Sequence, residues 1–135
     1  GPEDYDEFAA PHSAALIADV KAAYPDLPLI HFGTGTSPLL ERVQAVGGDV
    51  IGVDFHTDFE QARERLGYSQ PVQGNLDPVV LCGPADYVCD RAQRVVDANG
   101  GRLGHIFNLG HGILPPTPVD NVIRLVDYVH EATAQ

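Results

Sequence analysis

The sequence is poor in basic residues and has no long apolar run. Eight Lys and Arg stand against nineteen Asp and Glu, so the formal net charge of the 135 residues is -11 at pH 7. Such an acidic surface repels phosphate backbones, and no basic stripe offsets this, so nucleic acid is not expected as a partner. No segment reaches the ~20 apolar residues of a membrane span, and the acidic start does not resemble a signal peptide. We therefore expect a cytoplasmic protein without a membrane partner.

Cysteine is also scarce. Cys82 and Cys89 are separated by six residues, and no His–Cys pair lies beside them. Structural zinc sites combine four Cys or His ligands, so a metal site is not expected here. Two reduced thiols are the simpler interpretation, and a disulfide is the alternative.

Four short apolar runs, each ending in a turn signal, predict strands that are buried on both faces. They cover residues 27–32, 49–55, 71–76 and 105–109. Helical spacing between the runs predicts parallel strands joined by right-handed crossovers. The fold class is therefore α/β, and four such units make half of a (β/α)8 TIM barrel.

Proline, glycine and capping residues mark the ends of the helices between these strands. These signals are, in chain order, Ser37-Pro38 with Gly47-Gly48, Asp58 with Gln61, and Pro84 with Asn99-Gly100. One further helix over residues 3–24, kinked at Pro11, precedes the first strand. A last helix follows Thr117-Pro118. Apolar faces expected to pack on the sheet comprise Val88, Ala92, Val95 and Val96, and Val122, Leu125, Val126 and Val129.

Glycine and polar residues follow each predicted strand directly. These clusters cover residues 33–37, 54–57, 74–78 and 108–112. The carboxyl ends of parallel strands meet at one face of the sheet, where α/β proteins place their active sites. We therefore expect any chemistry at this face.

Two of these segments resemble motifs of the uroporphyrinogen decarboxylase family: Gln73-Gly74-Asn75-Leu76-Asp77-Pro78 and Gly104-His105-Ile106-Phe107-Asn108-Leu109-Gly110-His111-Gly112. The likeness extends in order through Pro2-Glu3-Asp4-Tyr5, residues 49–54, Pro115, Pro118, Asn121 and Val122. It implies that residues 1–135 are a single C-terminal half-barrel, with strands five to eight preceded by one helix.

The resemblance implies the removal of four acetate carboxyl groups from uroporphyrinogen, giving coproporphyrinogen in porphyrin and haem biosynthesis without a cofactor. Such an enzyme needs a proton donor, an anchor for the pyrrole N–H groups and cations for the carboxylates. The family's first half supplies the first two, so the isolated chain is expected to be inactive. Full-length members of the family are homodimers.

The resemblance also implies site residues. His111 matches the family's active-site histidine and is expected to bind a substrate carboxylate, with Gly110 and Gly112 allowing close backbone approach. The alternative is a histidine that only caps the loop. Asn108 and Gly110 are further candidates for substrate binding.

Other candidates depend on position alone. Asn75 could line the substrate pocket, although a tight strand-to-helix connection needs such residues regardless of substrate. His31 and Phe32 could wall the pocket or belong to the core. His56 is the second histidine candidate after His111, and His105 is expected to be structural.

Two competing interpretations remain. A corrinoid-linked methyltransferase shares the barrel but binds zinc through His and Cys, and no His-x-Cys occurs here. A non-catalytic half-barrel would expose the strand edges at residues 27–32 and 105–109, together with inward-facing apolar side chains. We therefore expect either self-association or binding to the missing N-terminal half of the barrel.

Overall fold

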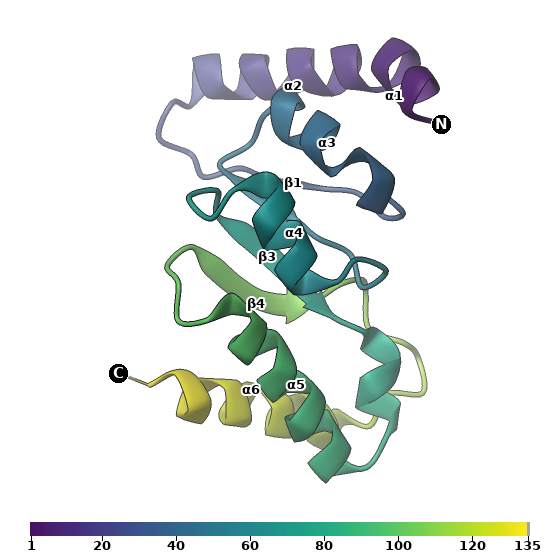
Figure 1. Cartoon of the computed structure of the whole chain (residues 1–135), viewed down its shortest axis with the longest axis vertical. Helices are drawn as coiled ribbons and strands as arrows, with labels where there is room; N and C mark the ends of the chain where they lie inside the picture. Colours follow the sequence, from purple (N-terminus) through teal and green to yellow (C-terminus); the bar gives the residue numbers. More distant parts are fainter. Residues whose placement is uncertain (135) are drawn as a thin grey trace.

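The computed structural model describes residues 1–134 and is organised as a helix pair followed by four strand–helix units (Figure 1). The elements are α1 (Pro2–Phe8), α2 (Ala10–Ala23), β1 (Ile30–Phe32), η1 (Ser37–Leu39), α3 (Leu40–Val46), β2 (Val50–Gly52), α4 (Phe59–Leu66), β3 (Val72–Leu76), η2 (Pro78–Cys82), α5 (Ala85–Asn99), β4 (His105–Leu109) and α6 (Val119–Thr133). No helix within residues 1–134 is long and apolar enough to cross a membrane. Cys82 and Cys89 are both free thiols.

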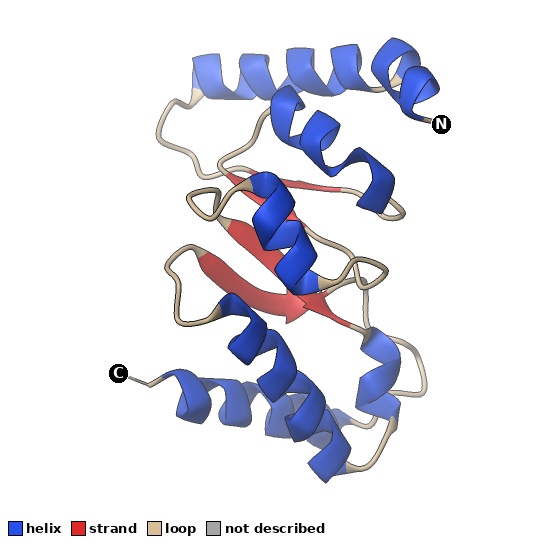
Figure 2. Cartoon of the chain, viewed as in Figure 1, coloured by secondary structure: helices blue, strands red, loops and turns tan. Residues whose placement is uncertain are grey.

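The four strands form one parallel sheet in the order β1-β2-β3-β4. Strands that are consecutive in sequence are therefore neighbours in space, as in a barrel. Figure 2 shows the helices arranged beside the strands, with the α1–α2 pair at the β1 end and α5 and α6 at the β4 end. The predicted α/β architecture of a partial TIM barrel is confirmed.

Three of the four strands are shorter in the structure than the residue ranges predicted for them. Pro28 has no N–H group for a ladder, and the Leu29 N–H donates instead to Asp49 Oδ2 at 2.7 Å. Strand β1 consequently begins at Ile30. Strand β4 has the predicted bounds.

The prediction that all four strands are buried on both faces was wrong for β1 and β4. Ile30, Phe32 and Ile106 are 43%, 44% and 44% exposed. By the sheet register these side chains share one face, whereas Ile51 and Val72 point to the other face and are fully buried under α4. The face that would line a barrel is thus open, which agrees with the predicted exposure of inward-facing apolar side chains.

The predicted helix boundaries are largely confirmed. Ala9 interrupts the opening helix, two residues before Pro11, whose nitrogen cannot donate to the preceding turn. Asp58 Oδ1 accepts the Gln61 N–H at 2.9 Å at the start of α4. Gly100 ends α5 in the left-handed conformation that glycine adopts readily.

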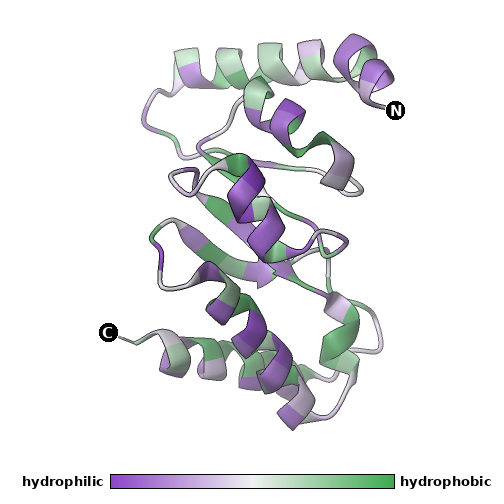
Figure 3. Ribbon diagram, viewed as in Figure 1, coloured by the Kyte–Doolittle hydropathy of each residue, from purple (hydrophilic) through white to green (hydrophobic). Residues whose placement is uncertain are grey.

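Two apolar clusters hold the helices on the sheet. One lies between α3, α4 and the strands β2 and β3, and the other joins α5, α6, η2 and the end of β3. Val88, Ala92 and Leu125 are buried as predicted, but Val126 is 47% exposed and does not belong to the core. In Figure 3 the ribbon of α4 is coloured mainly as hydrophilic, whereas the strands carry both hydrophobic and hydrophilic residues.

Candidate functional site

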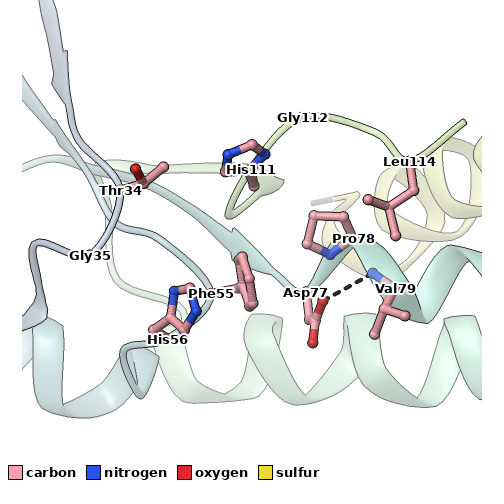
Figure 4. A pocket seen from close by; sticks show the side chains of 10 residues that line it. All are labelled: Thr34, Gly35, Phe55, His56, Asp77, Pro78, Val79, His111, Gly112 and Leu114. Atoms are coloured by element: carbon pink, nitrogen blue, oxygen red, sulfur yellow. Dashed lines mark hydrogen bonds between the residues drawn. The ribbon is translucent and has the colours of Figure 1, made fainter.

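A pocket of about 610 Å³ lies at the carboxyl ends of the strands, where the sequence predicted the chemistry. All four strand-to-helix loops contribute to it, so the pocket depends on the parallel sheet. Figure 4 shows its lining residues: Thr34, Gly35, Phe55, His56, Asp77, Pro78, Val79, His111, Gly112 and Leu114.

His111 is placed in this pocket by the course of the loop after β4. The Gly110 N–H donates to Leu76 O at 2.8 Å, which continues the pairing with β3. The same glycine lies against the backbone of the loop after β2, because a Cβ built on it would lie 2.3 Å from Phe55 N and 2.8 Å from the Asp54 carbonyl carbon. Only a residue without a side chain allows this approach, and the approach carries the next residue, His111, over the end of the sheet.

Asp54 connects two of the loops that form the pocket. Its side chain is completely buried in the loop after β2. The carboxylate accepts the Gly35 N–H of the first loop, the His56 N–H at 3.2 Å and the Thr57 hydroxyl at 3.3 Å. These bonds replace the water that burial removes from the charge. No role was predicted for Asp54, although an acidic residue directly after a buried apolar run is a signal that could have indicated one.

Asn75 is hydrogen-bonded to the backbone of the loop after β2, which carries Asp54. Its side-chain N–H group donates to Asp54 O at 2.9 Å and to Thr57 O at 2.6 Å. Asn75 is buried and does not line this 610 Å³ pocket, although it lines an adjoining pocket of about 410 Å³. Its contacts are therefore those of a connector between β3 and the loop after β2, and its binding of substrate stays a prediction.

The other site candidates lie outside this pocket. His31 faces the helices, with Nδ1 3.1 Å from Gly47 O at the end of α3. Phe32 lies on the open face of the sheet beside Gly52. Asn108 is exposed at the end of β4, and its Oδ1 accepts the neighbouring Leu109 N–H at 2.9 Å. Of the six predicted residues, His111 lines the pocket and Gly110 supports it.

Two further histidines, His105 and His56, lie in different environments. His105 lies in the helix-covered layer, where its Nε2 is 2.8 Å from Gly74 O and its ring is 4.5 Å from that of Phe59. Burial lowers the pKa of His105, which favours its neutral form and suits a structural residue. His56 instead projects into the pocket beside the Phe55 ring, with 4.0 Å between the ring centroids.

The pocket wall carries few ionisable groups. Among the lining residues these are His56, Asp77 and His111. Asp77 Oδ1 is engaged by the Val79 N–H at 2.9 Å (dashed in Figure 4), which caps η2. The two imidazoles are thus the groups of the wall that could carry positive charge. Within residues 1–134, no group of three or more His, Cys, Asp or Glu side chains is arranged to hold a metal ion.

The profile of the uroporphyrinogen decarboxylase family matches residues 1–132. The chain belongs to the uroporphyrinogen decarboxylase family. Similar curated proteins named uroporphyrinogen decarboxylase come from Sorangium cellulosum, 50% identical over 95% of this chain, and Geotalea daltonii, 48% identical over 99%. Another, from Thermus thermophilus, is 47% identical over 98%. The chain spans between 36% and 39% of the length of these relatives.

Among solved structures, a methyltransferase from Methanosarcina mazei has a similar fold. Its TM-score is 0.82 over 99% of this chain and 38% of its own length, at 21% sequence identity. This likeness supports the shared fold. The predicted family membership is thus confirmed by sequence similarity, and the partial barrel by the backbone.

Proposed function

We propose that this chain supplies the C-terminal half of the barrel of a uroporphyrinogen decarboxylase, which converts the four acetate side chains of uroporphyrinogen to methyl groups. The observation that carries the proposal is the pocket at the carboxyl ends of the strands, with His111 on its wall. Family membership and the identity of 47% to 50% with decarboxylases support it.

The chemistry uses the substrate as its own electron acceptor. A pyrrole α-carbon takes up a proton, and the ring becomes a cation. The bond between the acetate methylene and its carboxyl carbon then breaks, its electron pair enters the ring and carbon dioxide leaves. Protonation of the methylene carbon gives the methyl group, and loss of the proton from the α-carbon restores the pyrrole.

We assign to this chain the binding of substrate carboxylates. His111 donates a hydrogen bond to a carboxylate, and Gly110 holds the loop that presents it. A net charge of -11 disfavours a polyanion at long range, so local donors must hold it. The proton donor and the anchor for the pyrrole N–H groups belong to the N-terminal half of the barrel.

The partners follow from the open sheet face. We propose that the N-terminal half-barrel covers Ile30, Phe32 and Ile106 in the working enzyme, and that copies of the isolated chain associate through this face. The two free thiols are typical of the reducing cytoplasm, where we place the activity.

Turnover of uroporphyrinogen under anaerobic conditions tests this proposal. The chain is assayed alone and together with a separately expressed N-terminal portion of the Sorangium relative, with loss of carboxyl groups as the measurement. We expect activity only when the two halves are mixed. His111→Ala should lower kcat/KM at least tenfold, equivalent to ~1.4 kcal/mol of transition-state stabilisation.

His12→Gln is the matched control, because His12 is an exposed residue of α2 outside the pocket. It should leave the rate unchanged. Activity of the chain alone would contradict the division of roles between the halves. A folded, associated mixture that releases no carbon dioxide would contradict the decarboxylase assignment and leave a non-catalytic half-barrel.

A further inference from the structure

The second histidine of the pocket, His56, has its own neighbours and lies on a different loop from His111. His56 lies on the loop between β2 and α4, whereas His111 lies on the loop after β4. Figure 4 shows the His56 ring beside Phe55, separated in the pocket from the His111 ring. The His56 side chain is 60% exposed, so it is accessible to a ligand.

Asp54 orients this imidazole. His56 Nδ1 lies 3.4 Å from Asp54 Oδ2, and the His56 backbone N–H donates to Asp54 Oδ1 at 3.2 Å. The carboxylate is itself fixed, since it is fully buried and accepts the Gly35 N–H and the Thr57 hydroxyl. The contact of Nδ1 with Asp54 leaves Nε2 as the ring nitrogen available to a ligand.

We propose that His56, positioned by Asp54, is a second carboxylate-binding residue of this pocket. The inference rests on the proposed function, which brings a polycarboxylate to the site. A neutral imidazole that donates through Nδ1 has only an acceptor at Nε2, and an acceptor cannot bond to a carboxylate. A protonated ring donates through both nitrogens, so binding through His56 requires the imidazolium.

This requirement predicts that binding weakens as the pH rises, because an imidazole loses its positive charge between about pH 5 and 8. Other charged groups surround the ring. They are Asp54 and Asp58 on its own loop, Asp77 after β3, His111 across the pocket, and Arg91 and Arg94 of α5 in an adjoining 410 Å³ pocket that His56 also lines. The test must therefore change the His56 side chain while it leaves these other charged groups in place.

The experiment measures the fluorescence of uroporphyrin, an air-stable octacarboxylate, titrated with the 135-residue chain at about pH 6 and about pH 8. For the wild type we expect tighter binding at the lower pH. His56→Gln should weaken binding at the lower pH at least threefold and reduce the difference between the two conditions. His56→Lys keeps a cation that does not titrate in this range, so it should retain affinity and also reduce the difference.

Asp54 is tested as a positioning residue. Asp54→Asn should weaken binding at the lower pH in the same direction as His56→Gln. The double variant should lose little more than either single variant, because both changes remove one interaction. Circular dichroism checks that the Asp54→Asn protein remains folded, and His12→Gln is the control with unchanged binding.

Two results would overturn the inference. One is a His56→Gln protein that binds as the wild type does at both pH values, while His111→Gln is weakened. The other is a wild type that fails to bind uroporphyrin at either pH. Intact, His56-dependent binding together with absent turnover in the reconstituted barrel would instead contradict the decarboxylase proposal.

Discussion

At the scale of single residues, Gly110 and Gly112 on either side of His111 differ in the space around them. A Cβ on Gly110 would lie within 2.3 to 2.8 Å of the Asp54 and Phe55 backbone, which cannot move as a side-chain tip can. A Cβ on Gly112 would meet nothing within 4 Å. The position of His111 therefore depends on the first glycine.

We predict that Gly110→Ala lowers the free energy of unfolding by ~1–3 kcal/mol, as overpacking does. Urea denaturation followed by circular dichroism measures this. Gly112→Ala is the matched control and should change the stability by less than ~0.5 kcal/mol. Equal effects of the two substitutions would show that the approach of Gly110 to the loop after β2 does not matter for folding.

At the scale of elements, the N-terminus of α4 is fixed by one side chain. Asp58 accepts the Gln61 N–H, one of the groups that a helix start leaves without an internal partner. Asp58→Ala should therefore lower the free energy of unfolding by ~1 kcal/mol. Asp58→Asn keeps an acceptor at this position and should have little effect. If the two variants unfold at the same urea concentration, the hydrogen bond from Gln61 to Asp58 does not stabilise the protein. Any difference of both from the wild type would then come from the charge of Asp58.

At the scale of the whole molecule, the open sheet face and the net charge oppose each other. Ile106 and Phe32 are apolar, 44% exposed and on the same face, which favours association, whereas a charge of -11 repels copies of the chain. Sedimentation velocity should therefore show self-association that grows with protein concentration and with salt, since salt screens the repulsion.

Ile106→Lys should shift this equilibrium towards the monomer. The matched control is Ile123→Lys, because Ile123 is 55% exposed but lies on α6 rather than on the sheet. A wild type that stays monomeric at high concentration in high salt would contradict association through the sheet face. If Ile106→Lys and Ile123→Lys reduce self-association equally, the change in net charge rather than the sheet face is the cause.

Local signals were sufficient to predict much of this protein. Short apolar runs and the helical spacing between them predicted the α/β order. Side-chain caps such as Asp58 and glycine stops such as Gly100 act within a few residues, so their sequence pattern is readable. The family motifs singled out His111, which lines the pocket, and its binding of a substrate carboxylate stays a prediction.

The rest was decided by contacts between residues far apart in sequence. Asp54 receives the Gly35 N–H across 19 positions, and Asn75 reaches back across 21 positions to the same loop. The direction in which a strand side chain points depends on register, which turned His31 towards the helices and Phe32 towards the open face. The sequence alone determined which elements form and which motif they carry, because those depend on short-range spacing. Only the tertiary structure decided which side chains share the pocket, because that depends on how the strand ends meet.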